Sequence, residues 1–160
     1  MAANHYVTPT LPLEKVRAVR LGAGTGSANN MSDVDSGKMV KLVAESRYDL
    51  CAAGDKIEGL IVAVENATSG GYSVGGIVNE GEVYATADGL QATPGTGTIA
   101  IGDYVVAGTA TAKGTALTAY PKVCKATSQT FGAFTWRVES LGTAGTGAVG
   151  TTICLSRVDG

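Results

Sequence analysis

Residues 56–87 read KIEGLIVAVENATSGGYSVGGIVNEGEVYATA, and this stretch contains three apolar segments separated by turn residues. In the first segment, 56–66, apolar residues occupy both alternating faces, which is typical of a strand covered on both sides. The clusters SGG and NEG mark the turns before the segments 72–78 and 82–87. The glycines within these segments predict bulges or close backbone approach. Residues 56–87 therefore predict three consecutive short strands.

Short apolar or alternating segments separated by Gly, Thr and Ala clusters recur on both sides of this stretch. We expect further strands at 37–44, 99–108, 115–119, 122–127, 134–141 and 151–158. The stretches 87–98 and 142–150 are rich in breakers and predict loops. Eight or nine short strands at intervals of roughly ten residues, without a long helix, predict a mainly β protein, a small β-barrel or β-sandwich of short antiparallel strands.

The composition favours the same fold class. Glycine occupies 23 of the 160 positions, about twice its usual ~7% share, and glycine in a helix interior costs roughly 0.5–1 kcal/mol relative to alanine. Hydrophobic residues make up 44% of the chain, which is too many for a disordered linker. Aromatic residues make up only 6%, so we expect a core of Val, Ile, Leu and Ala.

Residues 1–36 differ from the rest of the chain. They contain Pro9 and Pro12, then LEKVRAVRL at 13–21, then the loop-like GAGTGSANNMSDVDSG. The segment LEKVRAVRL fits a short helix and an extended segment equally well, and it has little apolar surface of its own. We expect an extended N-terminal arm over 1–36 and a β-rich domain over 37–160.

The charges are segregated along the chain. Residues 1–44 carry five bases and three acids, residues 45–103 carry nine acids and two bases, and residues 104–160 carry five bases and two acids. The net charge of −2 argues against a nucleic-acid-coating protein. The distribution suits self-association or docking on a charged protein surface, and solvated loops would also produce it.

The cysteines and the N-terminus indicate a protein made in a reducing cytoplasm. Cys51, Cys124 and Cys154 are far apart in the sequence, and each lies in an apolar segment, so we expect buried thiols without a disulfide or a zinc site. No stretch approaches the ~20 apolar residues of a membrane span, and the N-terminus lacks the pattern of a signal peptide. We expect no membrane association and no cofactor.

The sequence offers little catalytic chemistry. The only histidine, His5, lies near the start of the chain, far from a rigid position beside a nucleophile. Asp33 and Asp35 are compatible with calcium but lack the acidic series of an EF-hand, so an Asx-turn or a solvated loop is the preferred interpretation.

Two further patterns have structural explanations. The glycines of GAGTGS at 22–27 are not followed by the helix start or the GK[ST] that phosphate binding requires, and Met39 follows Lys38 where Ser or Thr would hold magnesium. Glu80 and Glu82 flank a turn at Gly81 and lack the aromatic platform of a glycosidase. We interpret Trp136 as a core or oligomer anchor, and we expect no enzymatic activity and no small-molecule substrate.

Residues 37–108 contain three motif elements that follow one another along the chain. The element A-G-D-x-I-x-G followed by a hydrophobic residue is present from Ala53 to Leu60. A G-x-V strand follows at Gly81 and Val83, and then a hydrophobic-x-x-G-D-x-V element extends from Ile99 to Val105. In this order the elements resemble those of the bacteriophage head decoration, or capsid cement, proteins, and the resemblance covers under half of the chain.

This resemblance implies a small structural virion protein. Such proteins bind the outside of an icosahedral capsid, commonly as trimers, and clamp neighbouring subunits of the major capsid protein. The N-terminal arm is then the expected capsid contact, and Lys15, Arg17 and Arg20 would meet an acidic capsid surface. We expect a homotrimer on the outer surface of a virion.

Two other functional classes stay open. A virion-surface carbohydrate-binding or adhesion domain would use Tyr72, Tyr84, Tyr104 or Trp136 as stacking platforms. A small hydrolase would use Asp55 or Asp103, although both aspartates stand beside glycine and are expected to form turns.

Overall fold

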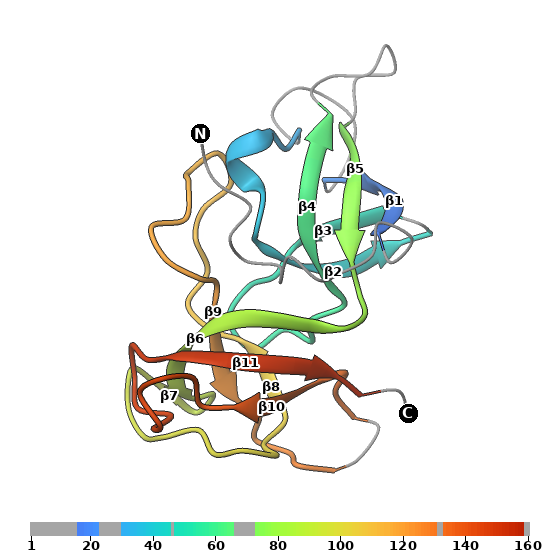
Figure 1. The fold of residues 1–160 in the computed structure, drawn as a ribbon. Helices are drawn as coiled ribbons and strands as arrows, with labels where there is room; N and C mark the ends of the chain where they lie inside the picture. The colour runs from blue at the N-terminus through green and yellow to red at the C-terminus, as the bar shows by residue number, and fades with distance from the viewer. Residues whose placement is uncertain (1–15, 23–29, 46, 66–72, 131–132, 159–160) are drawn as a thin grey trace.

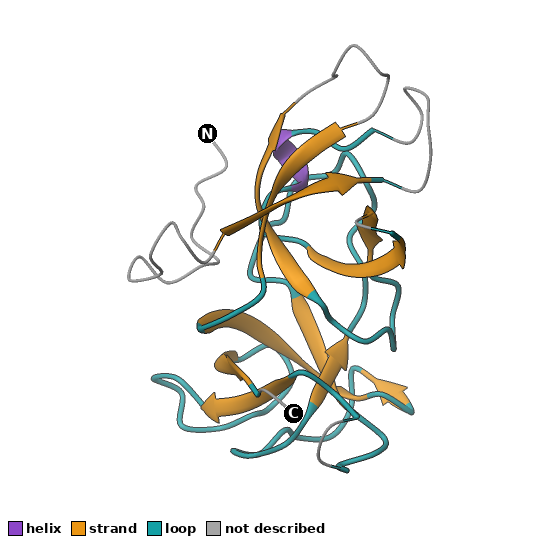
Figure 2. Ribbon diagram, turned by 90° about the vertical axis from the view of Figure 1, so that its right-hand side faces the viewer, coloured by secondary structure: helices purple, strands orange, loops and turns teal. Residues whose placement is uncertain are grey.

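The protein is described by a computed structural model that covers residues 16–22, 30–45, 47–65, 73–130 and 133–158. Two β units lie one above the other (Figure 1). In the view turned by 90°, strands and loops make up nearly the whole of the described chain (Figure 2). The regular helical element there is the short 3₁₀ helix η3 (Asp33–Asp35).

The first unit is a closed five-stranded barrel. Its strands are β1 (Val16–Leu21), β2 (Met39–Ala44), β3 (Arg47–Leu50), β4 (Gly59–Glu65) and β5 (Ser73–Val78). The order around the barrel is β1-β3-β2-β4-β5, and pairing of β1 with β5 closes it. Strands β1 and β3 are parallel, and the other neighbouring pairs are antiparallel.

Alternation along the strands fills the barrel with aliphatic side chains. The buried interior residues are Val19, Leu21, Met31, Val40, Tyr48, Ile61, Val64 and Ile77. Gly75 is required on β5 because a Cβ atom there would collide with the carbonyl oxygen of Ala63 and the side chain of Leu21. Strand β4 has a bulge between Ile61 and Ala63. These features confirm the expected bulge and close approach at the strand glycines.

The second unit is a six-stranded sheet. Its strands are β6 (Glu82–Leu90), β7 (Thr93–Pro94), β8 (Val105–Ala107), β9 (Lys122–Lys125), β10 (Trp136–Ser140) and β11 (Thr152–Arg157). The order is β10-β11-β6-β9-β8, with β7 paired to β6. A single bridge between Tyr104 and Arg137 brings the two ends of this sheet together.

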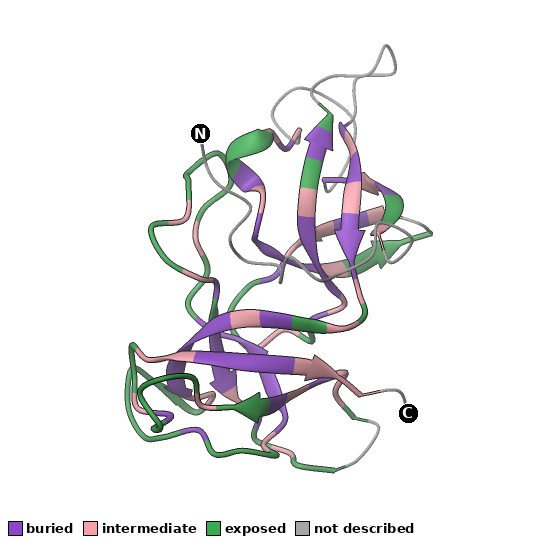
Figure 3. Cartoon of the chain, in the orientation of Figure 1, coloured by how far each residue is buried: buried purple, intermediate pink, exposed green. Residues whose placement is uncertain are grey.

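One hydrophobic core joins the two units. Met39, Leu60 and Val78 lie on the outer wall of the barrel and belong to the same buried cluster as Val83 and Trp136 of the second unit. Figure 3 shows buried residues along β6, β9 and β11 and along parts of β4 and β5. Because neither unit covers its own apolar surface completely, each supplies part of the other's core.

The mainly β prediction is confirmed, and the barrel is present. The strands are not all antiparallel as expected, because β1 pairs with β3 and β6 pairs with β9 in parallel. The expected loop at 87–98 contains the end of β6 and the short strand β7, and the strand expected at 99–108 is confined to β8. Two further local predictions are wrong. Residues 115–119 form a loop, since threonine and alanine alternate there without enough apolar surface to pack. Strand β3 was not predicted, because its sequence RYDL is short and polar.

The prediction of an arm over residues 1–36 is wrong for the part that the structure describes. Residues Val16–Leu21 are strand β1, an integral member of the barrel, and Val19 and Leu21 face its interior. Met31 and Asp35 are also buried. The few apolar residues of this segment suffice because β5 and β3 supply the rest of the core. Residues 1–15 and 23–29 lie outside the described residues.

Candidate functional site

Arg20 on β1 and Arg47 on β3 form a cationic surface on the outside of the barrel. Arg20 and Arg47 are direct partners in the parallel register of the two strands, so their side chains leave the same face one strand spacing apart. Arg17 lies on the other face of β1, together with Val19 and Leu21, and donates to the hydroxyl of Tyr48 at 3.4 Å. Arg20 and Arg47 are called the arginine surface below.

The arrangement of Arg20 and Arg47 carries an electrostatic cost. Like charges directly opposite one another on neighbouring strands repel. An anionic group bound to the two guanidinium groups would reduce this repulsion, since arginine binds carboxylate and phosphate through paired hydrogen bonds.

The sequence identified this surface only in part. Arg20 lies on it and Arg17 lies on the opposite face of the same strand, and both are residues of a barrel strand and not of an arm. Lys15 lies outside the described residues. Arg47 was missed because the strand that carries it gave no recognisable signal in the sequence, and its register with Arg20 is a property of the tertiary fold.

The aromatic residues that were candidates for sugar stacking have different environments. Trp136 is completely buried in the main core, which confirms its role as a core anchor and removes it as an exposed platform. Tyr104 is buried in a smaller cluster with Val106 and Cys124. Tyr84 packs against Tyr120 with ring centroids 5.5 Å apart. Tyr72 lies outside the described residues.

Asp55 and Asp103 close two turns of the same construction. Each accepts the backbone N–H of the alanine three positions earlier, Asp55 from Ala52 at 2.6 Å and Asp103 from Ala100 at 2.7 Å. Each also pairs with a lysine, at 2.6 Å to Lys41 and 2.9 Å to Lys125. The expectation that both aspartates form turns is confirmed.

The glycine before each aspartate links its turn to a neighbouring strand. Gly54 and Gly102 have φ angles of 86° and 88°, a region that costs other residues roughly 1–2 kcal/mol. Gly54 donates its N–H to the carbonyl of Ala107, and Gly102 donates to the carbonyl of Val138. The first of these bonds connects the barrel to β8, so the A-G-D element holds the two units together.

Substitution of Gly102 by Ala isolates the conformational cost of this turn. A Cβ atom at Gly102 would meet no atom within 4 Å, so only the positive φ opposes the change. We expect Gly102→Ala to lower the free energy of unfolding by about 1–2 kcal/mol, as measured by urea denaturation. Ile101→Ala on the same turn is the control, because that side chain is 63% exposed and should change stability by less than about 0.5 kcal/mol. Equal effects of the two variants would contradict this account.

Asp35, which the sequence offered as a calcium ligand, forms a buried ion pair with Lys38 instead. Its Oδ1 atom accepts from Lys38 Nζ at 2.6 Å and from the Gly114 N–H at 2.8 Å, and its Oδ2 atom accepts from the Ser32 N–H at 3.0 Å. Lys38 Nζ also donates to the carbonyl of Ala112 at 2.7 Å. Both side chains are almost fully buried, at 0% and 4% exposed. In the described residues, His, Cys, Asp and Glu form no cluster able to hold a metal ion.

The Asp35–Lys38 pair fastens the connection between β8 and β9, residues 108–121, to the barrel. This 108–121 loop is anchored at its start by Asp88, which accepts both the N–H and the hydroxyl of Thr109, at 2.8 and 2.6 Å. At its end, the carbonyl oxygens of Tyr120 and Pro121 accept from Thr86. A loop with little apolar content is therefore held by hydrogen bonds at three separate points.

The Asp88 anchor predicts a contribution to acid stability. Burial acts to raise the pKa of Asp88, but the hydrogen bonds from Thr109 and the charge of Lys122 outweigh it, so the pKa lies below its ordinary value. A carboxyl group whose folded pKa is lowered stabilises the fold above its unfolded pKa of about 3.9, and that stabilisation is lost as pH falls through the folded pKa.

We expect Asp88→Asn to lower the free energy of unfolding at pH 7 by about 1.5–3 kcal/mol. The variant should also lose less stability than the parent between about pH 5 and pH 2. Urea denaturation at a series of pH values measures both effects. An unchanged slope of stability against pH in this range would show that Asp88 does not hold the loop through its charge.

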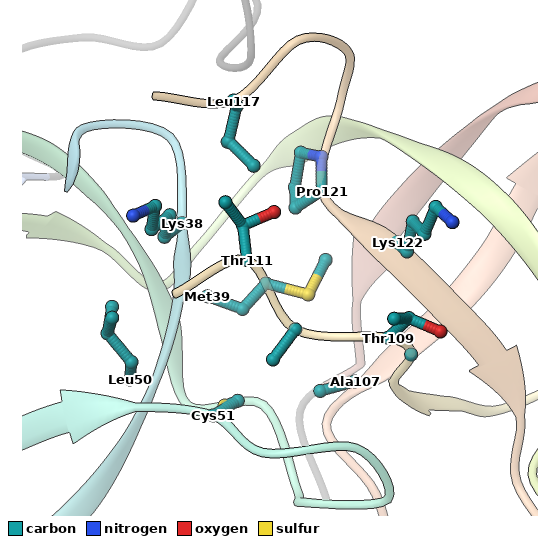
Figure 4. A pocket seen from close by; sticks show the side chains of 12 residues that line it. Lys38, Met39, Leu50, Cys51, Ala107, Thr109, Thr111, Leu117, Pro121 and Lys122 are labelled. Carbon is teal, nitrogen blue, oxygen red and sulfur yellow. The ribbon is translucent and has the colours of Figure 1, made fainter. Parts of the chain in front are cut away.

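The cysteines are free and buried, as expected. Burial raises the pKa of Cys51 to about 12 and that of Cys124 to about 11, so neither thiol is an activated nucleophile. Cys51 lines a small apolar cavity between the barrel and the 108–121 loop, with Met39, Leu117 and Pro121 around it (Figure 4). Its volume is about 30 Å³, the space of a single water molecule.

His5 and most of GAGTGS at 22–27 lie outside the described residues. Lys38, which was compared with the lysine of a phosphate-binding motif, forms an ion pair with Asp35. No helix in the described part of the chain is long and apolar enough to cross a membrane.

In comparisons with known proteins, no protein-family model, no curated protein and no solved structure matches the chain.

Proposed function

We propose that the protein is a structural virion protein that binds the outer surface of an icosahedral phage capsid. It stabilises the shell by clamping neighbouring subunits of the major capsid protein, and it acts as a homotrimer without enzymatic activity. The resemblance of residues 37–108 to capsid cement proteins motivates this proposal. The observation that carries it is the arginine surface, where Arg20 and Arg47 stand side by side on a barrel wall.

The arginine surface gives the proposal a definite partner chemistry. Two adjacent guanidinium groups suit the carboxylates of an acidic surface segment on the capsid. Repetition of the contact around a symmetric shell would add avidity without any further contact in a single copy.

The observed roles of the candidate catalytic residues favour a structural function. Asp55 and Asp103 are engaged in turns and lysine pairs, and Asp35 is engaged with Lys38. Each carboxylate thus has a role in holding the fold. This leaves assembly on a partner as the function that the described surface supports best.

Cosedimentation tests the proposal. The purified protein is mixed with undecorated heads of the phage that encodes it, and the bound fraction is measured against protein concentration at low and high salt. We expect saturable binding that weakens as salt rises, because the contact is charged and exposed. Binding that is absent, or equally strong at high salt, would contradict the proposed arginine contact.

A further inference from the structure

A polar groove of about 250 Å³ opens between the two arms of the 108–121 loop. Its lining includes Thr109, Thr111, Leu117, Thr118, Tyr120 and Lys122. We propose that this groove binds one pyranose ring of a surface glycan. The inference does not depend on capsid attachment, because it concerns a different face of the chain and the isolated protein can test it.

The groove is held open before any ligand arrives. Asp88 anchors its first arm through Thr109, the Asp35–Lys38 pair anchors the tip at Ala112 and Gly114, and Thr86 anchors the second arm. A loop of small residues without such anchors would lose conformational entropy on binding. Here the loop has already lost that entropy on folding. Binding of a weakly interacting ligand such as a sugar therefore carries a smaller entropic cost.

The walls of the groove match the two kinds of surface on a pyranose. Thr111 and Thr118 make no side-chain hydrogen bond to any residue that the structure describes, so their hydroxyl groups are available to sugar hydroxyls. Leu117 supplies an apolar surface, and Figure 4 shows it above Thr111 and beside Pro121 at the adjoining small cavity. The lining therefore offers both an apolar group and free hydroxyl groups, which complement the C–H face and the hydroxyl groups of a sugar ring.

An aromatic ring completes the site. Tyr120 lines the groove and packs against Tyr84 at 5.5 Å, so its orientation is fixed by a neighbour on β6. Tyrosine combines an apolar ring with a polar end. Tyr84 was one of the stacking residues suggested by the sequence, and in the structure its position supports Tyr120 at the groove.

The size of the groove limits the ligand. Pockets for drug-sized ligands span about 300–1,000 Å³, and this groove, at about 250 Å³, is smaller. It suits a single ring better than a disaccharide. Lys122 lies at the edge of the groove beside Asp88, at 3.6 Å, so the local charge is largely balanced and a neutral sugar is expected.

Ligand-observed and protein-observed NMR titrations of the isolated protein test the proposal. The probes are the methyl pyranosides of glucose, galactose, mannose and N-acetylglucosamine at millimolar concentration, with glycerol as a polyol that lacks the ring. We expect at least one glycoside to bind, with the shifted amide signals centred on residues 109–111 and 117–120. Binding of none, or shifts elsewhere, would overturn the proposal.

Matched threonine variants locate the site. Thr111→Val and Thr118→Val each remove one hydroxyl from the groove and should weaken binding about fivefold, the value of one ordinary hydrogen bond. Thr115→Val alters an exposed threonine at the tip of the same loop, outside the groove lining, and should leave affinity unchanged. Equal affinity in all three variants would overturn the assignment.

The form of the sugar is tested separately. A ring within a glycan has no free anomeric hydroxyl, and a methyl glycoside reproduces this feature. Binding of the free reducing sugar alone, without the methyl glycoside, would overturn the glycan assignment.

Discussion

Replacement of Lys38 by Met is expected to lower the free energy of unfolding by about 3–5 kcal/mol, because it leaves the Asp35 carboxylate buried without its counter-ion. Lys38 Nζ contacts Asp35 at 2.6 Å and the carbonyl of Ala112 at 2.7 Å, and the two side chains are almost completely buried. Methionine keeps most of the apolar stem and removes only the charge and its hydrogen bonds. Natural domains unfold with about 5–15 kcal/mol, so the loss should be visible directly in urea denaturation.

A surface pair provides the matched control for Lys38. Lys41 lies the same distance, 2.6 Å, from Asp55, but these side chains are 34% and 29% exposed. Lys41→Met should therefore cost no more than about 1 kcal/mol. The double variant Asp35→Asn with Lys38→Met should recover part of the loss, since no unpaired charge stays buried. A cost below about 1 kcal/mol for Lys38→Met would contradict the role assigned to the buried pair.

Replacement of Arg47 by Glu is expected to weaken capsid attachment by about 3 kcal/mol or more, roughly 100-fold in Kd. The reversal removes one guanidinium group of the arginine surface and places a negative charge against an acidic partner. Cosedimentation with undecorated heads at a fixed low salt concentration measures the effect. Arg137→Glu, the same change on β10 of the second unit, is the control and should bind as the parent does.

Stability separates loss of binding from loss of fold in the same variant. Arg47 is the register partner of Arg20, so Glu at this position replaces a repulsive pair by an attractive one. Pairs of opposite charge across strands contribute about 0.2–1 kcal/mol. We therefore expect Arg47→Glu to unfold at the same or a higher urea concentration than the parent. A variant that is more stable and still binds heads normally would exclude the arginine surface as the contact.

Local patterns in the sequence predicted much of the fold. The apolar segments of 56–66, 72–78 and 82–87 correspond to β4, β5 and the start of β6, because both faces of these strands meet buried surface. Strand β3 was not predicted, and the segment of β1 fitted a helix and an extended segment equally well, since both strands form only by pairing with each other and with their neighbours in the barrel. A strand with few apolar residues of its own is recognisable only when the barrel that surrounds it is known.

The candidate site was less predictable for the same reason. The resemblance to capsid cement proteins, together with their charge, pointed to Arg17 and Arg20, and the glycine beside each aspartate identified the turns at Asp55 and Asp103. The pairing of Arg20 with Arg47 and the binding of Asp35 and Lys38 to the 108–121 loop join residues far apart in the sequence. These contacts arise from the tertiary fold, so no local sequence pattern predicts them.

The central claim is that the chain binds the exterior of a phage capsid as a trimer. Cryo-electron microscopy of undecorated heads mixed with the purified protein tests it most directly. We predict ordered added density on the outer surface at the local three-fold or quasi-three-fold positions, with a barrel wall carrying Arg20 and Arg47 against the shell. Heads without ordered added density at these positions would contradict the claim.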